Sequence, residues 1–218
     1  MRTKKSYSYR ALFSISIPML FSAAFIFISN WTDVFMLGAM VTKAEVGIYN
    51  AAYKVATISL VIITSINTVL APKISRLFSQ NELDGIKREV IKSTKIITFL
   101  TLPIITIILI FRKAILHLFG PEFIEGELVL IILSVGLLFN AMSGSVGQIL
   151  NMTKYHKELR NFTILSAIIN VLLNYVLIIN YGIIGAALAS VISTFFLNFV
   201  CLTFIKKKLG FIAFYGFN

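Results

Sequence analysis

Lys54 is a basic residue within a long apolar run, and polar side chains recur around it at helical spacing. Asn50 precedes it by four residues and Thr57 follows it by three, with Tyr53 at the margin of the same face. At 100° per residue, this polar face extends almost the length of the run. A charge inside a membrane costs roughly 2.5–3.5 kcal/mol and needs compensation, so the favoured interpretation is a water-filled cavity or a substrate path.

A second polar face lies on the preceding apolar run and consists of Ser22, Ser29, Asn30 and Asp33. Asp33 is expected roughly 8 Å from the outer end of its helix, and Lys54 roughly 15 Å from the outer end of the next helix. An ion pair between Asp33 and Lys54 is therefore geometrically allowed, either as structural neutralisation or as part of a functional site. In a third interpretation, the Lys54 side chain snorkels outward to the membrane interface.

The later apolar runs also carry small and polar residues at helical spacing. They form three faces: Gly136, Asn140, Ser143, Gly144, Gly147 and Asn151; Thr163, Ser166, Asn170 and Asn174; and Gly182, Ala186, Ala189, Ser190 and Ser193. Residues of these types let membrane helices approach closely and hydrogen-bond to one another. For these three faces the favoured interpretation is helix packing, and a cavity is the alternative.

The composition of the chain is that of a membrane protein. Hydrophobic residues make up 58% of its 218 residues, charged residues 13%, and the mean hydropathy is +0.90. A span needs about 20 mainly apolar residues, and a backbone in lipid must satisfy its own hydrogen bonds, so such runs are helices. The predicted fold is therefore all-α, a single polytopic domain over residues 1–218 that forms a six-transmembrane-helix bundle. The predicted spans are residues 11–37, 46–74, 94–111, 128–151, 162–180 and 183–205, with an amphipathic segment at residues 82–93.

The distribution of basic residues predicts how the bundle crosses the membrane. Lys and Arg concentrate before the first run, between the second and third, between the fourth and fifth, and after the sixth. The other connections hold only Lys43, Arg112 and Lys113. The positive-inside rule then places both termini and the amphipathic segment in the cytoplasm.

The chain lacks the residues that several classes of function need. The chain has two aspartates, two histidines and one cysteine, which lies in an apolar run. No metal-ligand spacing, phosphate-binding glycine loop or nucleophile motif is present, so we expect neither an enzyme nor a bound metal or cofactor. The net charge of +11 comes from short connections rather than a basic arm, so nucleic acid is not an expected partner.

Six strings follow one another along nearly the whole chain: WTDVFMLG (31–38), VGIYNAAYK (46–54), NTVLAPKIS (67–75), LFGPEF (118–123), GQILNMT (147–153) and YGIIGAALAS (181–190). In this order they resemble the C-terminal half of bacterial polysaccharide and O-antigen flippases. These proteins belong to the multidrug, oligosaccharidyl-lipid and polysaccharide exporter superfamily.

The resemblance implies a lobe of six helices that encloses a central cavity together with a similar N-terminal lobe. Such proteins move a polyprenyl-diphosphate-linked oligosaccharide across the bacterial cytoplasmic membrane by alternating access, without hydrolysing a nucleotide. Cationic residues in the cavity suit the diphosphate, and Lys54 occupies the corresponding string, with Asn50 and Tyr53 beside it. The candidate substrate site is Lys54, Asn50, Tyr53, Thr57, Asp33 and Asn30.

The chain is shorter than the usual members of this family, which carry both lobes. We expect a fragment, a product of a split gene, or a half-transporter that needs a partner lobe in cis or in trans. Two other functions are carried as alternatives. One is a lobe of a cation-coupled multidrug exporter, and the other is a membrane assembly subunit whose polar faces serve only packing.

Overall fold

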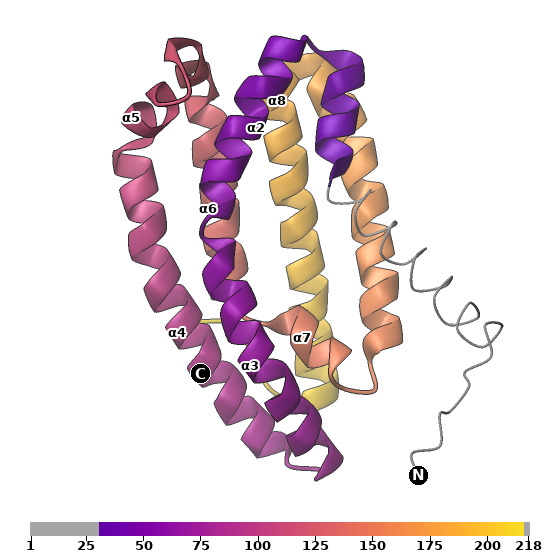
Figure 1. Cartoon of the computed structure of the whole chain (residues 1–218). Coiled ribbons are helices and arrows are strands. Elements are labelled where there is room, and N and C mark those ends of the chain that lie inside the picture. Colours follow the sequence, from indigo (N-terminus) through magenta and orange to yellow (C-terminus); the bar gives the residue numbers. More distant parts are fainter. Residues whose placement is uncertain (1–30, 216–218) are drawn as a thin grey trace, which may run out of the picture.

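The computed structural model describes residues 31–215, and these residues form helices and short connections with no strand (Figure 1). The described part begins with a helix over residues 31–40. The elements that follow are α2 (Lys43–Thr57), α3 (Leu60–Ser79), α4 (Leu83–Ile110), α5 (Arg112–His117), the 3₁₀ helix η1 (Pro121–Gly126), α6 (Glu127–Met142), α7 (Val146–Asn151) and α8 (His156–Leu209).

Three of the described helices are long and apolar enough to cross a membrane: α3, α4 and α8. The prediction of an all-α membrane protein is thereby confirmed. The bundle of six spans remains a prediction, because the predicted runs and the helices do not correspond one to one. Residues 11–30 of the first run lie outside the described residues, two runs are each divided between two helices, and α8 contains two runs.

The second predicted span is not one continuous helix, because it is interrupted at Ile58 and Ser59. Around this point the backbone makes tighter bonds, with Ile58 N donating to Val55 O and Ser59 N donating to Ala56 O. The Ser59 hydroxyl also donates to Ala56 O at 3.0 Å. A short 3₁₀ stretch of this kind bends a helix without exposing its backbone groups to lipid. The polar face predicted for residues 50–68 is therefore divided between two helix axes.

The fourth predicted span is divided by a turn at Gly144, where φ is +68°. A Cβ at this position would clash with the Thr94 hydroxyl, so α4 approaches the turn too closely for a side chain. The C-terminal segment packs at the same place, where Tyr215 N donates to Met142 O at 2.9 Å. The turn between α6 and α7 therefore depends on contacts with α4 and with the end of the chain.

The two arms of α8 form a hairpin that reverses direction at Gly182, where φ is 54° and ψ is −133°. Shortly after this turn the arms come so close that a Cβ on Gly185 would overlap the Leu177 carbonyl oxygen. The hydroxyl of Ser166 in the first arm donates to Ser193 O in the second at 2.8 Å. Small residues in the second arm thus permit the close contact that brings the polar faces of both arms together.

Gly185→Ala should therefore destabilise the protein. The added methyl has no free space and meets backbone, so the arms must separate, and overpacking of this type costs about 1–3 kcal/mol. Gly47→Ala is the matched control, because Gly47 lies within α2 and a Cβ there meets nothing within 4 Å. Thermal unfolding in detergent, followed by size-exclusion chromatography, measures both variants. Equal melting temperatures for the two variants would contradict the close approach of the arms.

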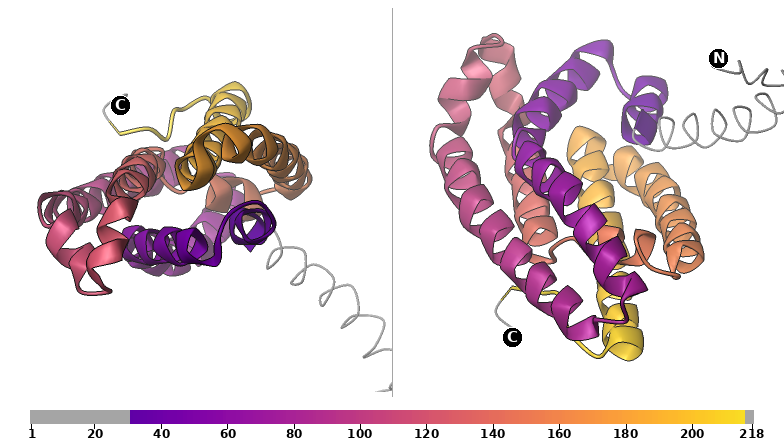
Figure 2. Two further views of the ribbon diagram at one scale, coloured as in Figure 1. Left: turned by 90° about the horizontal axis from the view of Figure 1, so that it is seen from above. Right: turned by 60° about the horizontal axis from the view of Figure 1, so that its bottom comes forward.

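The helices run roughly side by side, with α3 beside α4 and the two arms of α8 opposite α2 when seen from above (Figures 1 and 2). One buried cluster joins α2, α6 and the second arm of α8, and includes Tyr49, Leu130 and Ala186. Another joins α3, α4, α7 and the end of α8, and includes Ile74, Val90 and Ile205. The amphipathic segment predicted at residues 82–93 forms the first turns of α4 and continues directly into its apolar part.

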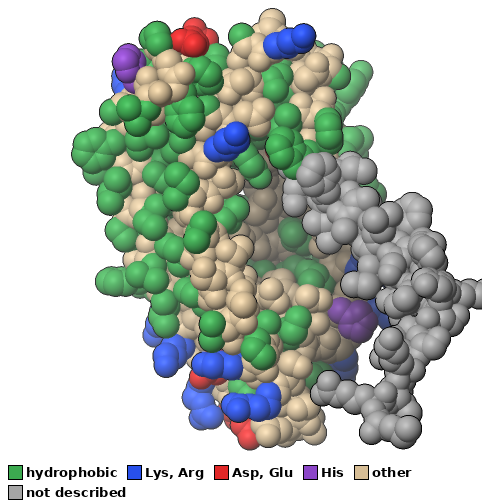
Figure 3. All heavy atoms as spheres, in the orientation of Figure 1, with side chains coloured by type: hydrophobic (Ala, Val, Ile, Leu, Met, Phe, Trp, Pro, Cys, Tyr) green, Lys and Arg blue, Asp and Glu red, His purple; other side chains and the backbone are tan. Residues whose placement is uncertain are grey.

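The two ends of the structure differ in charge. At the end with the α3–α4 connection, Lys and Arg side chains gather below a mostly hydrophobic surface (Figure 3). At the opposite end Arg112 and Lys113 lie close to one acid, Glu127, at 2.5 and 3.6 Å. The hydrogen bond from Arg112 lowers the pKa of the Glu127 carboxyl. Positive charge at this end is thus locally balanced, while the excess lies at the other end.

Candidate functional site

A cavity of about 340 Å³ opens between residues 31–40, α2, α6 and both arms of α8. Its lining combines apolar side chains with many amides and hydroxyls. The polar lining residues are Thr32, Asp33, Tyr53, Thr57, Asn140, Thr163, Ser166, Asn170, Ser190, Ser193 and Thr194. The cavity therefore offers hydrogen-bond donors and acceptors from residues 31–40, α2, α6 and α8 around a space of ligand size.

Asp33 is the only acidic residue in this lining, and it accepts hydrogen bonds from four side chains. Tyr49 Oη donates to its Oδ2 at 2.9 Å, and Ser190 Oγ donates to the same oxygen. Asn174 Nδ2 donates to Oδ1 at 2.6 Å and Asn170 Nδ2 donates at 3.3 Å. These partners come from α2 and from both arms of α8, so one carboxylate connects four helical segments.

The ion pair between Asp33 and Lys54 that the sequence allowed is not formed. The ion pairs among the described residues are Lys73–Glu89 and those of Glu127. The carboxylate of Asp33 is instead satisfied by neutral donors, which can compensate a buried charge without a counterion. Helix periodicity placed Asp33 on the polar face of its helix, whereas most of its hydrogen-bond partners lie on α8, which is distant in the sequence.

Lys54 lies on the outer side of α2, next to the cavity but not in its lining. Its side chain is exposed, as are Ile58 and Val61 on the same side, whose exposed fractions are 55% and 64%. Tyr53 and Thr57 lie on the adjacent side of α2 and face the cavity. The polar stripe of this helix therefore divides into an inward part with Tyr53 and Thr57 and an outward part with Lys54.

The predicted site is thus only partly brought together. Asp33, Tyr53 and Thr57 line one cavity, whereas Lys54 and the half-buried Asn50 do not. Asn30, the remaining candidate, lies outside the described residues. Within the described part of the chain, no group of three His, Cys, Asp or Glu side chains could hold a metal ion.

Sequence reasoning missed Tyr49 and undervalued the polar residues of α6 and α8. Tyr49 is almost completely buried, binds Asp33, and stacks on Tyr53 with ring centroids 6.2 Å apart. Asn140 both lines the cavity and accepts a hydrogen bond from Asn198 at 2.9 Å. The two interpretations of these polar faces, helix packing and cavity lining, therefore hold together for a residue such as Asn140.

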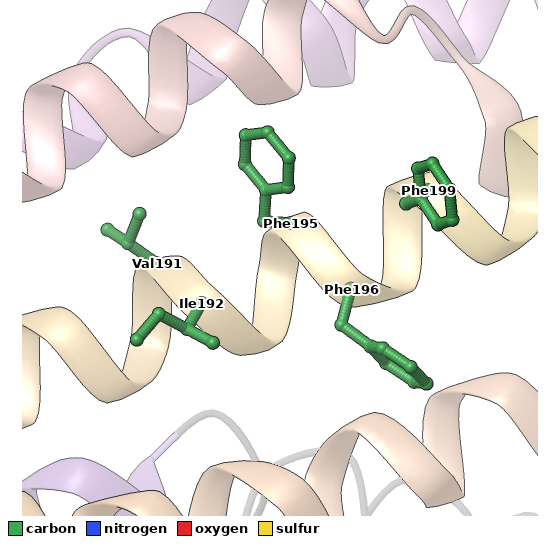
Figure 4. A pocket seen from close by; sticks show the side chains of 5 residues that line it. All are labelled: Val191, Ile192, Phe195, Phe196 and Phe199. Atoms are coloured by element: carbon green, nitrogen blue, oxygen red, sulfur yellow. The ribbon is translucent and has the colours of Figure 1, made fainter.

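A second hollow of about 340 Å³ lies along the second arm of α8 and is entirely apolar. It is lined by Val191, Ile192, Phe195, Phe196 and Phe199. Figure 4 shows Phe195 and Phe196 pointing to opposite sides of the helix. Since these side chains offer no hydrogen bond or charge, the hollow does not have the chemistry to select a polar ligand.

Comparison with known proteins identifies the family. A family model described as "Polysaccharide biosynthesis protein" matches residues 2–128. The chain belongs to this family. This match confirms the resemblance drawn from the six strings.

Three curated proteins are similar to this family member over most of its length. "Probable low-salt glycan biosynthesis flippase Agl15" of Haloferax volcanii is 30% identical over 84% of this chain and 39% of its own length. "Probable flippase AglR" of the same organism is 28% identical over 75% of this chain and 35% of its own. "Capsular polysaccharide biosynthesis protein CapF" of Staphylococcus aureus is 29% identical over 86% and 48%.

This family member spans less than half the length of each of these relatives. No solved structure gives a significant match. Two of these relatives are named as flippases and the third as a capsular polysaccharide biosynthesis protein, and none of the three is named as an enzyme. Together with the apolar helices of the described residues, these comparisons indicate a multi-pass membrane protein of the polysaccharide biosynthesis protein family.

Proposed function

We propose that this chain is a six-helix lobe of a flippase that moves a polyprenyl-diphosphate-linked oligosaccharide across the membrane by alternating access. The observation that carries the proposal is the polar cavity around Asp33, within an apolar helical protein of the polysaccharide biosynthesis family. Two relatives named as flippases support the transport activity. The C-terminal position of the lobe rests on the order of the six strings in the sequence.

In this proposal the substrate lies between this lobe and a second one, and α2 takes part on two sides. Its inner side, with Tyr53 and Thr57, belongs to the cavity within the lobe. Its outer side presents Lys54 and Asn50 to the space that the second lobe would enclose. An exposed ammonium there can bind a diphosphate as a point charge, and the amide can add a hydrogen bond.

The bend at Ile58 and Ser59 supports alternating access through this helix pair. The 3₁₀ stretch separates α2, which carries Tyr53 and Lys54, from α3. A hinge of this kind lets one half of a membrane span tilt while the other half stays packed. In this proposal the basic end of the structure faces the cytoplasm, as the positive-inside rule predicts, and the protein resides in the cytoplasmic membrane.

Deleting the coding sequence in its host tests the proposal. We expect surface polysaccharide to fall and lipid-linked oligosaccharide to accumulate in the membrane, because synthesis continues on the inner leaflet while transfer stops. Plasmid-borne wild-type protein should restore both. Normal polysaccharide with increased drug sensitivity would instead support a multidrug exporter lobe. Normal polysaccharide and drug sensitivity, with loss of another membrane protein from the membrane, would support an assembly subunit.

A further inference from the structure

The outer side of α4 carries basic residues immediately beside exposed apolar ones. Arg88, Lys92 and Lys95 recur at intervals of four and three residues, so they lie on one side of the helix. Phe99 continues the same line one turn later and has an exposed fraction of 77%. All three basic side chains are exposed as well. We call Arg88, Lys92 and Lys95 the α4 basic stripe.

Buried residues on the opposite side of α4 keep the α4 basic stripe on the outer side of the protein. Ile86, Val90 and Ile97 are completely buried against the rest of the protein. Because these residues lie on the inner side of the helix, the basic stripe cannot turn inward without exposing them. Figure 1 shows α4 along the outer edge of the structure, and Figure 3 shows Lys and Arg side chains at its lower end, beneath a hydrophobic surface.

The stripe has no acidic partner in the protein. All of the chain's Asp and Glu side chains lie within residues 31–215, so none is outside the described part. The acid closest in sequence, Glu89, pairs with Lys73 at 3.0 Å. Asp84 lies one turn before Arg88 and forms no ion pair with a described residue, so it offsets at most one of the three charges. The stripe therefore keeps a positive excess.

The spacing along the helix matches the boundary between lipid headgroups and hydrocarbon. Arg88 and Lys95 are seven residues apart, which is roughly 10 Å along the axis, and Phe99 follows roughly 6 Å farther. The headgroup layer on one side of a bilayer is roughly 5–8 Å deep, and flexible Lys and Arg side chains at the two ends of the stripe can reach it along the helix. Exposed Phe99 requires lipid chains, so the three cations one to three turns before it lie at the level of the lipid phosphates.

We propose that the α4 basic stripe binds the phosphate groups of anionic glycerophospholipids in the leaflet at this end of the protein. The argument is charge complementarity: three exposed cations without acidic partners face lipid at phosphate depth. Attraction to anionic headgroups adds with each Lys or Arg near the surface. The site is separate from the cavity around Asp33 and does not depend on the proposed transport activity.

The test uses the full chain purified in a neutral detergent and titrated with dioleoyl phosphatidylglycerol or dioleoyl phosphatidylcholine. Phosphatidylglycerol should raise the melting temperature by several degrees more than phosphatidylcholine. In the triple variant Arg88→Gln, Lys92→Gln, Lys95→Gln, the phosphatidylglycerol concentration that gives half of the shift should rise at least about tenfold. Native mass spectrometry should show correspondingly fewer phosphatidylglycerol molecules retained.

The matched control removes three charges from the same end of the protein: Lys206→Gln, Lys207→Gln, Lys208→Gln, all on exposed side chains at the end of α8. This variant should keep most of the phosphatidylglycerol effect. Equal losses in both triple variants would overturn the proposal in favour of non-specific attraction by net charge. An equal shift with inorganic phosphate alone would overturn it in favour of a free-anion site. Equal effects of the two lipids on the wild-type protein would also overturn it.

Discussion

Asp33→Ala should unfold the protein at a markedly lower temperature and abolish the proposed polysaccharide export. The substitution removes the common acceptor of Tyr49, Asn170, Asn174 and Ser190. A buried donor that loses its acceptor costs about 1–3 kcal/mol, and the four donors come from segments that would no longer be held together. Thermal unfolding in detergent and a measurement of surface polysaccharide check the two effects.

Asp33→Asn separates the charge of this residue from its shape. The amide keeps one oxygen that can accept hydrogen bonds but presents an NH₂ group where the carboxylate accepted, so the melting temperature should fall between those of wild type and Asp33→Ala. Asp84→Ala is the control, because Asp84 is the other aspartate, is exposed, and lies on α4 away from the cavity. A melting temperature of Asp33→Ala equal to that of Asp84→Ala would contradict the structural role of the carboxylate.

The general architecture was predictable because it follows from local properties. Long apolar runs predict helices in a membrane, and periodicity identifies the polar side of each helix. This reasoning placed Asp33, Tyr53 and Thr57 on the polar faces of their helices, and it grouped Asn170 with Asn174, which are hydrogen-bonded to each other. These features depend on residues a few positions apart, for which helix geometry fixes the relative direction of side chains.

The helix breaks could not be predicted, because the first has no clear local sequence signal and the second depends on a tertiary contact. Ile58 and Ser59 lie within an apolar run that has no glycine or proline near the break. At this break the Ser59 hydroxyl donates to Ala56 O and the Thr57 hydroxyl donates to Tyr53 O. Thr64 and Thr68 make the same type of bond inside the continuous part of α3, so such residues do not by themselves mark a break. At Gly144 the turn requires the approach of Thr94, about fifty residues away in the sequence.

The partners of Asp33 were unpredictable for the same reason. A helical wheel gives the direction of a side chain but not which helix it meets, and the cation on the polar face of the next predicted span was Lys54. The actual donors Asn170, Asn174 and Ser190 are 137, 141 and 157 residues away. Once these amides and hydroxyls satisfy Asp33, Lys54 is left without a counterion on the outer side of α2, which is the basis of its proposed role.

Lys54→Ala should reduce polysaccharide export at least about tenfold while leaving the melting temperature and protein level unchanged. The expected size follows from the loss of one charge-assisted contact, worth about 1.5–3 kcal/mol. Stability should not change, because the exposed Lys54 side chain forms no ion pair or hydrogen bond with a described residue. The assay requires the complete two-lobed transporter, in which the outer side of α2 faces the proposed substrate space.

Two further substitutions at this position decide whether charge or shape matters. Lys54→Arg should retain most of the export, because it keeps the positive charge, whereas Lys54→Gln should behave like Lys54→Ala. Lys43→Ala, at the exposed start of the same helix, is the matched control and should export normally. Full export by Lys54→Ala at a normal protein level would exclude Lys54 from substrate binding. The cavity around Asp33 would then be left as the candidate polar site on this lobe, and the outer side of α2 would be only a surface for packing.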